Sequence, residues 1–153
     1  RRAITWYNGN LKVWGDIIGT ENIIAKGVTN AASYEYPGTF YDIYNNTPTN
    51  LAWTTLYTKW AGSTLQIHCS ATWGYAKPID DTGNTGTITF GLYRGSTLLK
   101  SWSGEAGAAT EMDKTFWITD DGTSGNITYY LKVIQAVKAY VSHPAITVVE
   151  FRR

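Results

Sequence analysis

Short runs in which apolar and polar residues alternate recur along the chain, and they constrain its fold more than any other feature. In LQIHCSATW (65–73), apolar or small residues alternate with Gln, His, Ser and Thr. The same period of two appears in GTITFGLY (86–93) and NITYYLKV (126–133). Successive side chains of a β-strand point to opposite faces, so each run predicts a strand with one buried face. Uninterrupted helical periodicity over three turns is absent.

Turn-forming residues separate these runs. ITWY (4–7) and LKVW (11–14) flank Asn8-Gly9-Asn10, a combination typical of a β-hairpin. Further runs bounded by Gly, Pro, Asn or Asp lie at 51–60, 97–102, 113–119 and 145–151. Many short strands separated by turns predict an all-β protein, with the strands in an antiparallel jelly roll or β-sandwich.

The character of the sequence changes twice along the chain. Residues 1–30 are punctuated by glycine and carry steps of isoleucine, and we interpret them as a shaft end, a trimerising β segment. Residues 31–50 are rich in tyrosine and turn residues, and are either an ordered connection or a weak edge strand. Residues 51–153 hold the regular alternating runs and are predicted to form the β-sandwich head.

An apolar step recurs every six residues in GDIIGTENIIAKGVT (15–29). The residues that form it are Ile17, Ile18, Ile23, Ile24 and Val28. Ordering a backbone costs roughly 1–2 kcal/mol per residue, and so narrow an apolar row cannot be buried within its own segment. Three intertwined copies could turn these side chains inward and remove free strand edges. The alternative is a pair of edge strands packed on the head of the same chain.

The composition argues against nucleic acid and membrane partners. The formal net charge is +1, and the doublets Arg1-Arg2 and Arg152-Arg153 are isolated at the ends, so no basic patch marks a nucleic-acid surface. No apolar run is long enough for a membrane helix, and we expect a protein that is not membrane-embedded. Aromatic residues make up 14% of the chain and charged residues only 16%, which favours an adhesive surface. Because no initiator Met is present, we expect the chain to be part of a longer protein.

The first thirty residues and the β head together resemble the C-terminal tip region of bacteriophage tail fibres and tail-tip attachment (host-specificity) proteins. The pattern G-N-L-x-V-x-G-x-I is matched here from Gly9 to Ile17, and I-x-A-x-x-V-T from Ile23 to Thr29. In the head, TITFGLYRGSTLL (87–99), FWITDDGTSGNITYYLKV (116–133) and ITVVEF (146–151) are similar to the strands of small jelly-roll tips. The resemblance covers most of the chain.

This resemblance implies a virion protein: a homotrimer at the distal end of a tail fibre that binds a receptor on the bacterial surface. The receptor would be a polysaccharide or an outer-membrane protein. The resemblance implies no catalytic residue and no cofactor, so we expect a protein that is not an enzyme. Two alternatives stay open, namely a capsule or O-antigen depolymerase module and a structural trimerisation or shaft-cap module without a receptor.

Residues suited to catalysis or metal binding are few and have simpler explanations. His68 lies on the polar face of its run and His143 precedes Pro144 at an expected turn, so neither is placed for a Ser-His-Asp site. The pairs Asp80-Asp81 and Asp120-Asp121 fit turn geometry, although with Asn84 and Asn126 they could supply oxygen ligands to Ca²⁺. We predict no metal site. Cys69 shares the apolar face of its strand and is expected to be buried and inert.

Aromatic residues in expected loops are the candidates for binding, because Tyr and Trp combine a large rigid contact area with a polar group. The predicted receptor-binding residues are Trp73, Tyr75, Lys77, Asp80, Asp81, Asn84, Trp102 and Glu105, in or beside loops at 74–84 and 103–111. The tyrosine-rich stretch lies next to the shaft. We therefore assign Tyr34, Tyr36, Phe40 and Tyr41 to the trimer interface, together with the apolar row at 17–28.

Overall fold

The computed structural model describes residues 4–7, 10–13, 27–43, 48–75, 87–105, 110–120, 124–136 and 139–152. Its regular structure within these residues consists of eleven β-strands and no helix. The strands are β1 (Ile4–Tyr7), β2 (Asn10–Val13), β3 (Gly27–Glu35), β4 (Thr39–Ile43), β5 (Thr49–Lys59), β6 (Ser63–Tyr75), β7 (Thr87–Arg94), β8 (Thr97–Glu105), β9 (Thr110–Asp120), β10 (Gly125–Gln135) and β11 (Ala139–Arg152). The prediction of an all-β chain is confirmed.

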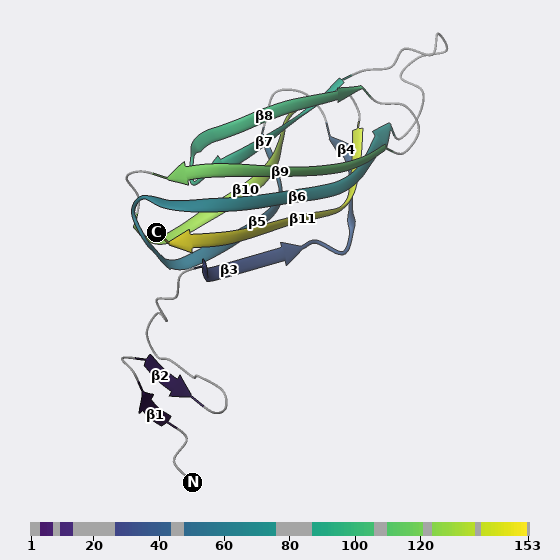
Figure 1. The fold of residues 1–153 in the computed structure, drawn as a ribbon. Helices are drawn as coiled ribbons and strands as arrows, with labels where there is room; N and C mark the ends of the chain where they lie inside the picture. Colours follow the sequence, from purple (N-terminus) through teal and green to yellow (C-terminus); the bar gives the residue numbers. More distant parts are fainter. Residues whose placement is uncertain are drawn as a thin grey trace, which may run out of the picture.

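Two antiparallel sheets lie face to face and form a sandwich (Figure 1). One sheet has the order β5-β10-β7-β8, and the other has the order β3-β11-β6-β9, with β4 also paired to β11. One side of the sandwich is therefore bounded by the edge strands β3 and β5, and the other by β8 and β9. Along each of these two sides, exposed side chains of one sheet can lie beside exposed side chains of the other.

The core follows from the alternation in the sequence. Strand β6 buries alternate residues from Leu65 to Trp73, and β10 buries Tyr129, Leu131 and Val133 against them. Strand β7 adds Ile88, Phe90 and Leu92 from the same sheet as β10. Full burial of such a side chain stabilises the fold by roughly 1.5–3 kcal/mol, so these inward faces fix how the two sheets stack.

Residues 31–50, for which the sequence left an ordered connection or a weak edge strand open, contain strands of the sandwich. Strand β3 pairs with the second half of β11 from Glu35 opposite Ala145 to Gly27 opposite Arg152. Strand β4 pairs with the first half of β11, with Thr39 opposite Ser142. The sandwich therefore begins at residue 27 and not at 51. Alternation is weak in SYEYPGTFYDI because both strands lie at a sheet edge, where fewer side chains are buried.

A bulge in β11 allows this one strand to pair with both β3 and β4. The pairing of β11 with β6 shifts between Ser142 and Ala145, and His143 there has a positive φ of 48°. The His143 N–H donates to the carbonyl of Gly38 at 2.9 Å, and the Tyr36 N–H donates to the carbonyl of Pro144 at 3.0 Å. His143 is thus at a bulge inside a strand, whereas the sequence predicted a turn before a strand.

The hairpin predicted at the start of the chain is confirmed. Strands β1 and β2 pair in register from Tyr7 opposite Asn10 to Ile4 opposite Val13, and form a separate two-stranded sheet (Figure 1). This pairing is within one chain. Ile17, Ile18, Ile23 and Ile24 lie outside the described residues, and Val28 lies in β3, where its neighbour is Phe151 of β11. A shaft formed between chains therefore stays a prediction.

Candidate functional site

An open groove runs along the side of the sandwich where the edge strands β3 and β5 meet. Its volume is about 390 Å³. The lining residues come from five consecutive positions of β3 and four positions of β5: Asn30, Ala31, Ala32, Ser33, Tyr34, Trp53, Thr54, Thr55 and Tyr57. Among these described lining residues none is charged. The groove is therefore a neutral surface made of rings, hydroxyls and one amide.

Three large aromatic side chains are exposed in this groove. The rings of Tyr34 and Trp53 stack with their centroids 5.5 Å apart and an interplanar angle of 27°. Tyr34 is 38% exposed, Trp53 47% and Tyr57 66%, so each presents a ring surface to solvent. Exposed rings that already stack on one another are held in place before a ligand arrives, which lowers the entropy lost on binding.

Hydrogen bonds fix the polar groups around these rings. The side-chain amide of Asn30 donates to the backbone carbonyl of Tyr57 at 2.6 Å and thereby ties β3 to β5. The hydroxyls of Thr55 and Thr128 lie 2.9 Å apart on neighbouring strands. Ser33 and the phenol groups of the two tyrosines add further hydroxyls. The groove can therefore contact an apolar ring face and hydrogen-bond to hydroxyl groups at the same time.

Sequence reasoning missed Trp53 and Tyr57. In β5 the residues Ala52, Thr54 and Leu56 are buried, and Trp53 and Tyr57 occupy the alternate, outward positions. Large aromatic residues at the polar positions of an alternating run were the signal that could have found them. The sequence assigns Tyr34 to a trimer interface because its stretch lies next to the predicted shaft. Its partner across the groove, Trp53, could not be known without the fold.

Of the predicted receptor-binding residues, Trp73 and Trp102 come together around Phe90 of β7. Trp73, expected to open a loop, lies in β6 and is only 3% exposed, with its ring edge-on to Phe90 at 5.9 Å. The ring of Trp102 in β8 stacks on that of Phe90, with the centroids 5.8 Å apart, and it also packs on Phe116 of β9, with the centroids 5.1 Å apart. Trp73 is thus chiefly a core residue, because it continues the inward face of β6.

Of the remaining predicted receptor-binding residues, two end strands and four lie outside the described residues. Tyr75 ends β6 and Glu105 ends β8, at the same end of the sandwich as Trp73 and Trp102 (Figure 1). Lys77, Asp80, Asp81 and Asn84 lie outside the described residues.

The tyrosine-rich stretch assigned to the trimer interface is divided between different surroundings. Tyr34 lies in the groove, and Tyr36 and Phe40 pack on each other with centroids 4.7 Å apart, both partly buried. Tyr41 is largely exposed. Their role between chains stays a prediction.

His68 and Cys69 are successive residues of β6, and their side chains have different surroundings. His68 is partly exposed, with its Nδ1 atom 3.2 Å from the Thr115 hydroxyl and 3.5 Å from an Asp113 carboxylate oxygen. Cys69 is buried, as predicted, and desolvation raises the pKa of its thiol to about 12. Within the described ranges, no group of three or more His, Cys, Asp and Glu residues could hold a metal ion. No helix among these residues is long and apolar enough to cross a membrane.

No protein-family model and no curated protein sequence matches the chain. Among solved structures, the PRD1 vertex protein P5 is similar over 82% of this chain and 99% of its own, with 18% identity and a TM-score of 0.47. The infectious bursal disease virus VP2 subviral particle is similar over 95% of this chain and 40% of its own, with 14% identity and a TM-score of 0.48. The C-terminal CBM6 of LamC from Zobellia galactanivorans has 12% identity and a TM-score of 0.36, over 77% of this chain and 99% of its own. At TM-scores below 0.5, these likenesses do not identify a function for this chain.

Proposed function

We propose that this chain is a receptor-binding module of a virion tail fibre, and that it attaches the particle to a glycan on the bacterial surface. The observation that carries the proposal is the groove between β3 and β5, where Trp53 stacks on Tyr34 beside the exposed Tyr57. The resemblance of the sequence to tail-fibre tips supports a place on a virion. A surface glycan is preferred over an outer-membrane protein because of the chemistry of the groove.

A sugar ring has one face of C–H groups and a rim of hydroxyls. The exposed faces of Trp53 and Tyr34 suit the C–H groups, because both are flat, apolar and partly desolvated by each other. Asn30, Ser33 and Thr55 lie on both sides of the groove and can exchange hydrogen bonds with the hydroxyl rim. An open groove can also accommodate a long polymer, since neither end requires a chain terminus.

The proposal is for binding without catalysis. A glycosidase needs two carboxyl groups roughly 5–9.5 Å apart on either side of the scissile bond. Among the described residues that line the groove, none is acidic. Glu111 and Asp113 are exposed on β9, at the opposite side of the sandwich.

A homotrimer would compensate for a weak single site. One open groove buries little of a ligand, so its affinity for a single glycan is expected to be low. Three grooves per fibre tip would raise the effective concentration of the remaining sites once the first is occupied. The isoleucine row at 17–24 supports the trimer, because it needs an apolar environment that one chain segment cannot provide.

Binding of purified bacterial capsule and O-antigen polysaccharides tests this proposal. We expect the wild-type chain to bind at least one such glycan, and Trp53→Ala to weaken that binding by about thirtyfold, because a central aromatic contact contributes about 2 kcal/mol. Trp117→Ala is the matched control. Trp117 is 61% exposed on β9, outside the groove, so its removal leaves binding unchanged. Equal loss in both variants, or no glycan bound by the wild type, contradicts the proposal.

A further inference from the structure

The exposed rings of the groove continue across the outer face of the smaller sheet. Trp53 of β5 lies opposite Tyr130 of β10, and Tyr130 lies opposite Tyr93 of β7. Trp53 is 47% exposed, and the two tyrosines are partly exposed. Side chains directly opposite on neighbouring strands have Cβ atoms about 4.5–5.5 Å apart. Trp53, Tyr130 and Tyr93 therefore form a row of rings across three strands, which we call the ring row.

A positive charge lies beside this row. Lys132 follows Tyr130 by two residues on β10 and shares its outward face, because Leu131 and Val133 are buried. The Nζ atom of Lys132 lies 4.6 Å from the ring centroid of Tyr93 and 4.9 Å from that of Tyr130. Two cation–π contacts hold the ammonium in place before a ligand arrives, which lowers the side-chain entropy lost on binding.

A glycine gives the rings room to lie in this way. Gly91 of β7 is opposite Lys132, and a Cβ atom on it would lie 2.7 Å from Cε2 of Tyr93 and 2.6 Å from Cδ1 of Ile134. The Tyr93 ring therefore lies over the bare backbone of β7, next to Lys132.

The ammonium of Lys132 can still bind a ligand. Lysine has three N–H donors, and a ring face attracts the charge without providing an oxygen acceptor. Within the part of the chain that the structure describes, Lys132 contacts these two rings and forms no hydrogen bond or ion pair. A carboxylate on a ligand would accept a charge-assisted hydrogen bond from it.

The described strands of the two sheets differ in charge. Those of the smaller sheet carry four basic residues and one acidic residue: Lys59, Arg94, Lys100, Lys132 and Glu105. Those of the larger sheet carry two basic residues and six acidic ones: Glu35, Asp42, Glu111, Asp113, Asp120 and Glu150. The electrostatic field therefore favours an anionic ligand at the smaller sheet.

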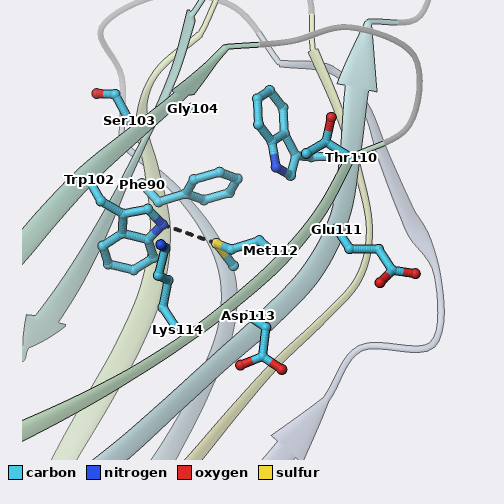
Figure 2. Close-up of a pocket in the computed structure, with 10 residues that line it drawn as sticks. Phe90, Trp102, Ser103, Gly104, Thr110, Glu111, Met112, Asp113 and Lys114 are labelled. Atoms are coloured by element: carbon cyan, nitrogen blue, oxygen red, sulfur yellow. Dashed lines mark hydrogen bonds between the residues drawn. The ribbon is translucent and has the colours of Figure 1, made fainter.

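The pocket at the opposite side of the sandwich is less suited to an anion. It lies between β8 and β9 and has a volume of about 210 Å³. Glu111 and Asp113 line it together with Lys114 (Figure 2). Its rings Trp73 and Phe90 are core residues, 3% and 1% exposed.

We propose that the ring row and Lys132 select an acidic glycan whose sugar units carry carboxylates. This inference rests on the proposed glycan-binding function and names the chemical class of its ligand. One sugar ring stacks on Trp53, the glycan continues over Tyr130 and Tyr93, and a uronate carboxylate accepts from the Nζ atom of Lys132.

The single ammonium favours a carboxylate over other anions. A terminal phosphate carries a charge of about −1.5 to −2 and is typically recognised by a cluster of basic groups. Single-stranded nucleic acid also stacks on aromatic rings, but its backbone is bound in a positively charged groove. The ring row instead holds one lysine, which matches the single charge of a uronate.

Polysaccharides compared with their carboxyl-reduced forms test this inference. Capsule and O-antigen polysaccharides that contain glucuronate or galacturonate are immobilised beside the same polymers after reduction of their carboxylates to alcohols. We expect the wild type to bind at least one acidic polymer about tenfold more tightly than its reduced form, the effect of one charge-assisted hydrogen bond. Added salt should shrink this preference, because it screens an exposed ion pair.

Substitutions separate the charge from the stacking. Lys132→Met keeps the aliphatic chain over the rings and removes the charge, so it should lose the preference while its affinity for the reduced polymer stays unchanged. That unchanged affinity also shows that the variant is folded. Lys114→Met removes an exposed lysine from β9 and is the matched control, which should keep the preference. Trp53→Ala should weaken binding of both forms alike.

Neutral polysaccharides, phosphate-bearing glycans and single-stranded poly(dT) complete the set of probes. Tighter binding of any of these, equal binding of an acidic polymer and its reduced form, or a preference that survives Lys132→Met overturns the inference. Binding of a neutral glycan that depends on Trp53 would overturn it and leave the proposed function standing. Failure to bind any glycan contradicts both.

Discussion

The backbone of one residue, Trp60, is held by two buried side chains of opposite charge. The Nζ atom of Lys59 donates to the Trp60 carbonyl at 2.9 Å, and a carboxylate oxygen of Glu150 accepts from the Trp60 N–H at 2.8 Å. The hydroxyl of Ser63 donates to the same carbonyl at 2.8 Å. These contacts fix the turn from β5 to β6, and therefore the end of the strand that carries Trp53 and Tyr57.

Glu150→Ala should lower the free energy of unfolding by about 3 kcal/mol. The substitution removes the carboxylate that accepts from the Trp60 N–H, and it removes the negative member of two buried charges that both bond to Trp60. Urea denaturation measures the change. The exposed Glu111→Ala is the control and should stay within about 0.5 kcal/mol of the wild type. A similarly small effect for Glu150→Ala would show that these contacts do not hold the turn.

The thiol of Cys69 should be unreactive in the native protein. Burial raises its pKa to about 12, so the thiolate that reacts with Ellman's reagent is scarce at pH 8 and the sulfur is also covered. The unfolded chain has an ordinary thiol pKa of about 8.5. Above this unfolded pKa, the folded state keeps the thiol proton of Cys69 that the unfolded state loses. The free energy of unfolding therefore falls as the pH rises from the unfolded pKa toward the folded one. Comparable labelling rates with and without urea would contradict this.

At the scale of the elements, β11 is the strand on which the larger sheet depends. It pairs with β6 along its whole length, and its bulge at His143 lets β4 and β3 follow one another on its other edge. A left-handed backbone costs a residue with a side chain roughly 1–2 kcal/mol, and the exposed His143 side chain gains little in return.

Substitutions at His143 should therefore follow backbone preference and not side-chain chemistry. His143→Gly should keep or raise the thermal midpoint, because glycine adopts positive φ without strain. His143→Val should lower it, since a β-branched residue is strongly disfavoured in this conformation. Differential scanning calorimetry of both variants checks the order. If valine proved as stable as glycine, the bulge would not have the geometry described.

The strands from β5 to β11 could be predicted from the sequence, whereas β3 and β4 were left open as either a connection or a weak edge strand. The alternation in 65–73 and 126–133 correctly assigned the buried faces of β6 and β10, since both strands have a neighbour on each side. The same alternation places Trp73 on the buried face of β6. Its choice as a binding residue rested instead on the suitability of tryptophan for binding surfaces, and that argument was wrong about its position. Strands β3 and β4 pair on one edge only, and their weak alternation concealed them.

The candidate groove was beyond prediction for a different reason. Tyr34 and Trp53 belong to different sheets and meet only because β3 and β5 are the edge strands on the same side of the sandwich. That juxtaposition depends on strand order, which no local pattern encodes. The pocket of Figure 2 was partly anticipated, because Trp73 and Trp102 were both chosen, but Phe90 and Met112 were not.

For the whole molecule, the proposed trimer predicts a mass three times that of the 17.0 kDa chain. Sedimentation equilibrium should give this value at micromolar concentration, and the thermal midpoint should rise with protein concentration because folding and association are coupled. Ile23→Asp, which places a charge in the isoleucine row, should shift the mass toward one chain. A wild-type chain that sediments as a stable monomer would contradict the trimer, although not the groove.

The central claim is that the exposed ring stack between β3 and β5 recognises the host surface. The most direct measurement is the amount of labelled protein retained on host bacterial cells, for the wild type, Trp53→Ala and Trp117→Ala. We predict that the cells retain equal amounts of the wild type and Trp117→Ala, and much less of Trp53→Ala. Periodate oxidation of the cell-surface sugars should abolish the retention of all three proteins. Undiminished retention of Trp53→Ala, or retention of the wild type on oxidised cells, would contradict the account.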